Sequence, residues 1–277
     1  MKHLKLFESM TEIKVEKICK KYRIKNWTLN PDGTVDVDGS VDLSKQRLSK
    51  LPLKFGRVTG NFYCSDNQLT SLEGCPTEVG GGFYCWRNQL TSLEGCPTEI
   101  RGSFWCHHNQ LTSLEGCPKE ISGAFDCSYN KLTSLEGCPT EIGGNFYCYN
   151  NQLTSLEGCP REIGGNFLCY DNQLTSLEGC PTEISGIFYC HNNQLTSLKG
   201  APEYIEKEVN FIANPNLPEY IQQILKLNGY DTDIQKYILK WQKDYDVWRR
   251  DGSFNQDRFI LMMQDAGDEL SKLKLPE

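Results

Sequence analysis

The chain has 277 residues, of which 29 are basic and 36 are acidic, for a formal net charge of −7. This acidic balance argues against a nucleic-acid-binding protein, which normally carries a basic stripe. No apolar run approaches the ~20 residues that a membrane-spanning helix requires. The first residues also lack an apolar segment long enough for a signal peptide. We therefore expect a cytoplasmic protein without a membrane partner.

Thirteen of the fourteen cysteines follow a repeat rather than a set of unique pairs, and Cys19 lies outside it. Seven recur from Cys64 to Cys190 at a spacing of 21 residues, and six recur from Cys75 to Cys180 at the same spacing. A disulfide framework is typical of small secreted chains, and no secretion signal accompanies this set. We therefore expect reduced thiols that act as small buried hydrophobic side chains.

Residues 1–40 are predicted to form an N-terminal cap. Ser9 and Glu12 fit a capping box ahead of a short helix from about Met10 to Tyr22. A turn signal follows at residues 30–33, and residues 34–43 then alternate in polarity, which predicts two short strands. Such a segment can cover the first of a series of stacked repeats, which would otherwise expose core and an open sheet edge.

Residues 41–217 repeat with a period of 21 residues. Strict self-similarity at this period predicts a solenoid in which each coil buries its apolar face against its neighbours. A degenerate first copy covers residues 41–61, and a truncated last copy ends near Leu217. The clear copies between them begin at Phe62, Phe83, Phe104, Phe125, Phe146, Phe167 and Phe188.

Each copy reads Phe-x-Cys-x-x-Asn-x-Leu-x-x-Leu. The Phe-x-Cys alternation predicts one short strand per coil, and stacking these strands gives a parallel sheet with the Phe column as its inner spine. The two Leu columns and a later Ile or Val column close the core. Gly and Pro in the rest of each copy oppose a long helix, so extended or turn structure is predicted on the convex side.

This pattern resembles the leucine-rich repeat. The Leu-Thr-Ser-Leu-Glu-Gly-x-Pro copies, preceded by an Asp-Gly turn and Leu51-Pro52-Leu53-Lys54-Phe55, resemble more closely the 21-residue-repeat leucine-rich repeat proteins of large DNA bacteriophages. The resemblance implies an α/β solenoid with a parallel sheet on the concave face, a helix-plus-hairpin cap and a C-terminal helical cap. It also implies a viral origin, and hence a location in the host cytoplasm.

Two kinds of polar column are predicted to be scaffold. The Asn column from Asn67 to Asn193 is expected to satisfy backbone groups where the chain turns. Stacked Glu columns, from Glu73 and from Glu78, must face water or meet cations because like charges ~4.8 Å apart repel. A calcium site is less favoured than a solvated edge, since apolar positions separate the Glu columns.

Residues 218–277 lose the period and are predicted to be helical. One helix is expected from Pro218 toward Gly229, a second begins after Asp231 and carries its apolar face to Trp248, and a third contains Phe259 and residues up to 273. The segment is interpreted as a C-terminal cap. The alternative is a small partner-binding module, with anchors Trp241, Trp248, Arg249 and Arg250.

The copies differ most at three positions per coil, predicted to lie side by side on the exposed concave face. The first follows the Phe, and the second and third follow the first Cys of each copy. Tyr, Trp and Arg are enriched at protein interfaces, although cross-strand stacking is an alternative reason for aromatic columns. The predicted partner-binding residues are Tyr63, Tyr84, Trp86, Arg87, Trp105, His107, His108, Tyr129, Tyr147, Tyr149, Tyr170, Tyr189 and His191.

We therefore predict a non-enzymatic protein-binding module without a cofactor or metal. The phage resemblance would make its partner a host protein, such as a defence component. A carbohydrate-binding protein that stacks sugar rings on the same face, beside Asn150, Asp171 and Asn192, is the alternative. Single-stranded nucleic acid would need a basic groove that these columns lack.

Enzymatic chemistry is not predicted. A Cys–His pair needs mutual reach, but strand alternation puts the cysteines and histidines on opposite faces of the sheet. No cysteine follows Cys190, so the catalytic cysteine of the ubiquitin-ligase type that follows some bacterial leucine-rich repeats is missing. His107 and His191 are four coils apart, ~19 Å, which is too far to share a metal ion.

Overall fold

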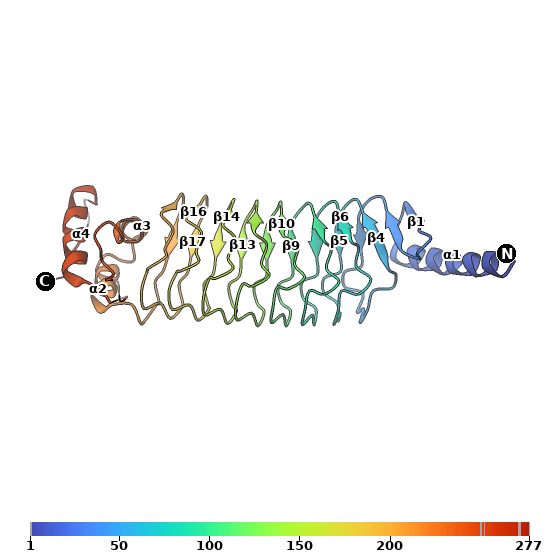
Figure 1. Ribbon diagram of the computed structural model, residues 1–277, viewed down its shortest axis with the longest axis horizontal. Coiled ribbons are helices and arrows are strands. Elements are labelled where there is room, and N and C mark those ends of the chain that lie inside the picture. Colours follow the sequence, from blue (N-terminus) through green and yellow to red (C-terminus); the bar gives the residue numbers. More distant parts are fainter. Residues whose placement is uncertain (1, 250, 252, 271–272, 277) are drawn as a thin grey trace. The chain divides into compact units, whose positions relative to one another are not determined.

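The computed structural model describes residues 2–249, 251, 253–270 and 273–276. The chain is a parallel-sheet solenoid with helices near both termini (Figure 1). It divides into two compact units. Unit 1 contains the residues up to 130 together with 137–139, and unit 2 contains residues 131–136 and 140–277. The fold class predicted from the repeat is therefore confirmed.

Unit 1 begins with helix α1 (Lys2–Tyr22) and a hairpin of β1 (Trp27–Leu29) and β2 (Val35–Val37), which pair antiparallel. Each later coil contributes two short strands to two parallel ladders. One ladder continues from β2 through β4 (Phe55–Val58), β6 (Glu78–Val79), β8 (Glu99–Ile100) and β10 (Glu120–Ile121). The other contains β3 (Val41–Asp42), β5 (Phe62–Tyr63), β7 (Phe83–Tyr84), β9 (Phe104–Trp105) and β11 (Phe125–Asp126).

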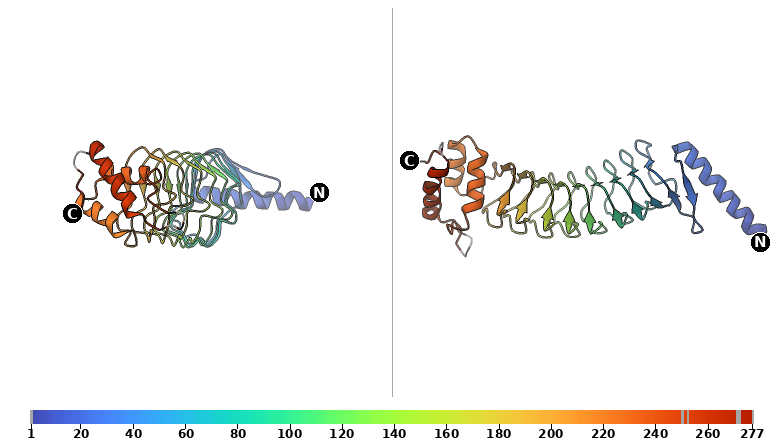
Figure 2. Two further views of the ribbon diagram at one scale, coloured as in Figure 1. Left: turned by 60° about the vertical axis from the view of Figure 1, so that its left-hand side comes forward. Right: turned by 90° about the horizontal axis from the view of Figure 1, so that it is seen from above.

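Unit 2 repeats this arrangement and ends in three helices. One ladder contains β12 (Glu141–Ile142), β14 (Glu162–Ile163), β16 (Glu183–Ile184) and β18 (Tyr204–Ile205). The other contains β13 (Phe146–Tyr147), β15 (Phe167–Leu168), β17 (Phe188–Tyr189) and β19 (Val209–Asn210). The helices are α2 (Glu219–Leu227), α3 (Thr232–Trp241) and α4 (Gln256–Glu269), drawn in orange to red (Figure 2).

The core of each unit follows the repeat. The Phe column is fully buried, and neighbouring rings lie close together, with centroids 5.5 Å apart for Phe83 and Phe104 and 5.6 Å apart for Phe167 and Phe188. Burying such a side chain contributes roughly 1.5–3 kcal/mol to stability. Cys106 is a fully buried free thiol, and burial raises its pKa well above the ordinary value. This cysteine is therefore a protonated core side chain.

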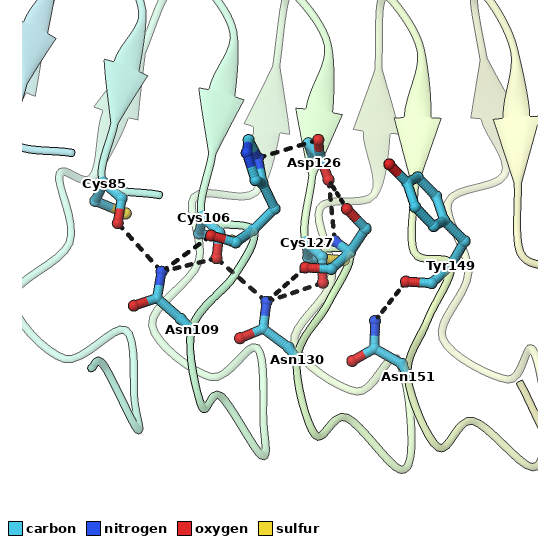
Figure 3. Close-up of polar contacts among 10 residues, drawn as sticks. Cys85, Cys106, Asn109, Asp126, Cys127, Asn130, Tyr149 and Asn151 are labelled. Atoms are coloured by element: carbon cyan, nitrogen blue, oxygen red, sulfur yellow. Dashed lines mark hydrogen bonds and ion pairs between the residues drawn. The ribbon is translucent and has the colours of Figure 1, made fainter. Parts of the chain in front are cut away.

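The Asn column confirms the structural interpretation. Asn109 donates from Nδ2 to the carbonyl oxygens of Cys85 (3.1 Å) and Cys106 (3.0 Å) (Figure 3). Its Oδ1 accepts from the Leu90 N–H at 3.0 Å. Each such amide therefore joins its own coil to the preceding one. This satisfies backbone groups that would otherwise be buried without a partner at the turn.

The N-terminal cap differs from its prediction in two ways. Helix α1 begins at Lys2 rather than Met10, so Ser9 lies within the helix and the predicted capping box is wrong. The strand β1 was not predicted, although the two predicted strands of this region appear as β2 and β3. Helix α1 ends at Tyr22, and the next residue, Arg23, adopts the left-handed conformation (φ +58°) that usually selects glycine. The cap signals were therefore less regular than those of the repeat.

The Glu-Ile and Glu-Val segments, predicted as extended, pair between coils. Glu78 lies opposite Glu99 in the register of β6 and β8, and Glu162 lies beside Glu141 in β14 and β12. Their Ile and Val side chains point into the core, while Glu99 and Glu162 are exposed. The side opposite the Phe strands is therefore a second parallel ladder with an acidic outer face.

The C-terminal helices cover the last coil of unit 2. The Asp231 side chain accepts from the backbone N–H groups of Asp233 (2.9 Å) and Ile234 (3.2 Å), which confirms the predicted helix cap. Buried Gln235 of α3 accepts from the Phe211 N–H at 2.9 Å. The helical module thus satisfies the open edge after β19, as a cap must.

The helix boundaries of this module require corrections. Helix α3 ends at Trp241, so the predicted continuation to Trp248 is wrong, and Trp248 instead bridges Phe254. Helix α4 ends at Glu269, before Leu273. Among the predicted anchors of the alternative module, Trp241 and Trp248 are half-buried and Arg249 is exposed. Arg250 lies outside the described residues.

Candidate functional site

The first two variable columns lie on the outward face of the Phe ladders. In β5 and the residues after it, Phe62 and Cys64 are buried, while Tyr63 between them is half-exposed. The third column lies in the turn that ends each Phe strand. Its backbone is left-handed in every coil, with φ between +50° and +58° at Lys45, Asp66, Arg87, His108, Tyr129, Asn150, Asp171, Asn192 and Ala213. The three columns are therefore not equivalent, because this turn imposes its own residue preference.

Aromatic rings of unit 1 stack along the first two columns. Tyr63 and Tyr84 are nearly parallel with centroids 4.8 Å apart, and the Trp105 ring meets Tyr84 edge-on at 5.2 Å. In the second column, Trp86 stacks on His107 at 5.3 Å and 10°. Cross-strand packing therefore accounts for much of the aromatic content of these columns. Most of these rings are half-buried, and Trp105 is the most exposed of the first column at 37%.

A polar cluster interrupts the aromatic columns in the copy that starts at Phe125. Asp126 is buried and accepts from the Ser128 hydroxyl (2.6 Å) and the Ser128 backbone N–H (3.0 Å). Its other carboxylate oxygen lies 3.1 Å from His107 Nδ1, although that nitrogen has no partner of hydrogen-bond geometry within the described residues (Figure 3). The Asp126 carboxylate thus lies beside the His107 ring, whose centroid is 6.1 Å from that of the Trp105 ring.

Asp126 and Ser128 were not among the predicted site residues. The sequence signal that could have identified them is that the first and second variable positions of this copy are both small and polar, whereas the other clear copies have a large side chain at one or both. The same Asp-x-Ser pair occurs at Asp42 and Ser44 of the first coil, where Ser44 also donates to the Asp42 carboxylate. Because the hydrogen-bonded pair forms locally, its burial beside His107 depends on the neighbouring coil.

Three large side chains of unit 1 project from consecutive left-handed turns. Arg87 is exposed, its guanidinium lies 5.3 Å from the Trp86 ring centroid, and it is 3.8 Å from Asp66. His108 is exposed and stacks on Tyr129 at 4.2 Å, and Tyr129 is 42% exposed. We name Arg87, Trp105, His108 and Tyr129 the turn cluster. It gathers the large exposed side chains of the predicted face in unit 1.

The turn cluster has little net charge. Burial, the neighbouring His107 and Arg87 lower the pKa of His108. His108 is therefore neutral at neutral pH. Arg87 is the cation of the cluster, and Asp66 lies beside it. A partner of this surface would meet aromatic rings and one guanidinium, the composition typical of protein-binding hot spots.

The predicted residues of unit 2 form a different pattern. Tyr149 stacks on Tyr170 at 4.5 Å, and Tyr170 stacks on His191 at 4.6 Å. Burial lowers the pKa of His191. Tyr147 meets Tyr149 edge-on at 6.4 Å, and the Tyr189 hydroxyl donates to Glu208 at 2.7 Å. These rings are all half-buried.

In unit 2, the left-handed turns of the clear copies carry residues suited to that backbone, whereas the truncated last copy has Ala213. Asn150 and Asn192 both donate to the Asp171 carboxylate, at 3.2 and 2.8 Å. Asn and Asp are the L-residues that adopt this conformation most readily. The turn row of unit 2 therefore has a structural explanation, which Arg87 and Tyr129 of unit 1 lack.

No family model and no curated protein matches the sequence. Among solved structures, the chain is similar to YopM from Yersinia enterocolitica WA-314, with 20% identity and a TM-score of 0.34, over 64% of this chain and 49% of the YopM chain. The chain thus spans about half the length of that neighbour. The ladders of short strands establish the solenoid fold.

Two further findings concern the part of the chain that the structure describes. None of its helices has the length and apolar content needed to cross a bilayer. Within the same residues, no three His, Cys, Asp or Glu side chains converge on a point where a metal ion could bind. His107 lies on the outer face, whereas Cys106 is buried in the core. The predicted separation of these two residue types therefore holds at this coil.

Proposed function

We propose that this chain is a non-enzymatic protein-binding module and that the turn cluster of unit 1 is its recognition centre. The supporting observation is the placement of Arg87 and Tyr129 in left-handed turns. A side chain with a Cβ costs roughly 1–2 kcal/mol in that conformation, and Asn or Asp reduces this cost. Residues that oppose their local backbone, and that are also exposed, indicate a function other than folding.

The packing of the variable columns around the turn cluster favours a protein over a carbohydrate. Sugar rings bind against open faces of aromatic side chains, but Tyr63, Tyr84 and Trp86 turn ring faces toward neighbouring rings. A protein interface uses ring edges and a guanidinium equally well. The resemblance to phage repeats supports a host protein as the partner, such as a defence component.

Affinity purification from a bacterial host lysate with mass spectrometry tests the proposal. The wild-type chain should enrich a defined protein that an Arg87→Asn/Tyr129→Asn variant does not retain. The matched control is Tyr204→Ser, which removes a tyrosine that is 56% exposed on the other ladder. The melting temperatures of both variants should lie within a few degrees of the wild-type value. Equal recovery by the turn-cluster variant, or selective binding to a glycan array instead, would refute the proposal.

A further inference from the structure

The charge of the chain is divided along its length. Residues 1–57 contain 13 basic and 7 acidic side chains, a net charge of +6, whereas residues 58–277 contain 16 basic and 29 acidic ones, a net charge of −13. The acidic total therefore conceals a basic N-terminal region in unit 1. Salt screens exposed charges over roughly 8–10 Å at physiological ionic strength, so the local charge and not the total governs contacts of this region.

The basic charge of α1 forms a stripe. Lys17 and Lys21 follow Lys14 by three and seven residues, which places the three lysines on one face of the helix. They are exposed, and Val15 and Cys19 on the other side are buried. At 1.5 Å per residue, successive lysines of the stripe are about 4.5 and 6 Å apart along the helix axis. Within the described residues, none of the three forms an ion pair.

An acidic column in the same unit has a matching spacing. Glu78, Glu99 and Glu120 start β6, β8 and β10, whose register places them in adjacent strands. Parallel strands are about 4.8 Å apart, close to the average spacing of the lysine stripe. Among the described residues Glu99 and Glu120 have no ion-pair partner, and Glu78 lies 3.5 Å from Arg57. Like charges stacked at this spacing repel until a cation lies between them.

The stripe and the column cannot pair within one molecule. Helix α1 packs against β1, and β8 is separated from β1 by β2, β4 and β6. That separation is about 19 Å, beyond the reach of a lysine side chain. The stripe also faces solvent, away from the side that Val15 and Cys19 bury. A partner of opposite charge for either surface would therefore come from another molecule.

We propose that two copies of this chain associate through these surfaces, with the lysine stripe of each copy on the Glu78–Glu99–Glu120 column of the other. A two-fold arrangement uses both pairs of surfaces at once and closes the assembly as a dimer. It brings three lysines to three glutamates on each side and removes the repulsion within the column. This inference does not depend on the proposed function, because it uses the opposite ladder from the turn cluster.

Sedimentation velocity of the full chain, under reducing conditions, tests the proposal. The wild type should be dimeric at low salt and should dissociate as salt rises, because raising ionic strength from ~0.1 to ~1 M shortens the screening length from about 10 to 3 Å. The variants Lys14→Glu/Lys17→Glu/Lys21→Glu and Glu78→Lys/Glu99→Lys/Glu120→Lys should each be monomeric at low salt. An equimolar mixture of these two variants should restore a dimer, since each carries the charge complement of the other.

A control with the same charge change distinguishes this interface from a general charge effect. Lys207→Glu/Lys226→Glu/Lys274→Glu changes three exposed lysines of unit 2 and should remain dimeric. A monomeric wild type at low salt, a monomeric control variant, or a mixture that stays monomeric would overturn the proposal. Binding of a short single-stranded oligonucleotide by a monomeric wild type would instead assign the lysine stripe to nucleic acid. The mixing experiment also excludes misfolding as the reason for a monomer, because misfolded variants cannot complement each other.

Discussion

The strain at Arg87 gives the most direct test of the recognition centre. Arg87→Asn and Arg87→Ala both remove the guanidinium, and with it the contact to Trp86 at 5.3 Å and the ion pair to Asp66 at 3.8 Å. The two variants differ in their fit to the left-handed turn at φ +50°. Asn tolerates that conformation, whereas Ala bears the cost of its Cβ, so Arg87→Asn should be the more stable by about 1 kcal/mol.

Differential scanning calorimetry measures this difference without knowledge of the partner. A change of 1 kcal/mol shifts the melting temperature by roughly 2–4 °C in a chain of this size class. Relative to the wild type, Arg87→Asn loses contacts of an exposed cation and ion pair, each worth roughly 0.5–1 kcal/mol or less. Relief of strain offsets this loss, so Arg87→Asn should melt close to the wild type.

The control is a position where the backbone conformation does not favour Asn over Ala. Gln89 is exposed and lies two residues after Arg87, outside the left-handed positions. There the Asn and Ala variants should differ by less than ~0.5 kcal/mol. If Arg87→Asn is no more stable than Arg87→Ala, the turn does not select its residue by conformation. Arg87 would then carry no sign of being retained for recognition.

Two further predictions concern the scaffold. Asn109→Ala removes the acceptor for the Leu90 N–H and the donor to the Cys85 and Cys106 carbonyls. Urea denaturation should therefore show a decrease of about 2–4 kcal/mol in the free energy of unfolding. A decrease below about 1 kcal/mol would contradict the structural role of the Asn column. Burial lowers the pKa of His191 in the folded chain, so protonation of His191 favours the unfolded chain. The contribution of neutral His191 to stability is complete above the ordinary histidine pKa of ~6.5. It should fall as the pH decreases below that value toward the pKa of the folded chain. Thermal melting from pH 7.5 to 5.5 should show a smaller decrease for His191→Gln than for the wild type, and an equal decrease would contradict this assignment.

Much of the fold could be predicted because a repeat states the same physical constraint many times. The Phe, Leu and Asn columns each identify one position in the coil, and a core that fits one copy fits all. The caps occur once, so their prediction rests on single local signals. Ser9 resembled a helix start but lies inside α1, whose first residues extend beyond the predicted boundary. The strand β1 has no repeat partner in the sequence to reveal it.

The candidate site shows a second limit. Variation among copies identified the three columns, but it could not rank them. In the sequence alone, Tyr63, Trp86 and Tyr129 are all aromatic residues at variable positions and cannot be told apart. The backbone separates them. Tyr63 and Trp86 lie on the outward face of the ladder, where stacking on neighbouring rings explains an aromatic side chain. Tyr129 lies in a left-handed turn, where local conformation favours another residue.

A solenoid therefore provides its own reference for detecting function. The same left-handed turn recurs along the chain, and Asp66, Asn150, Asp171 and Asn192 show what the backbone alone selects there. Asn and Asp residues in this turn fit the backbone, so they need no functional explanation even when they are exposed. Within the seven clear copies, the departures that oppose this preference, at Arg87 and Tyr129, retain a cost of about 1 kcal/mol each that folding does not require; Lys45 and Ala213 occupy the same turn in the degenerate first copy and the truncated last copy. A cost of this size is maintained where the side chain itself is used, which is the physical reason for placing the recognition centre in unit 1.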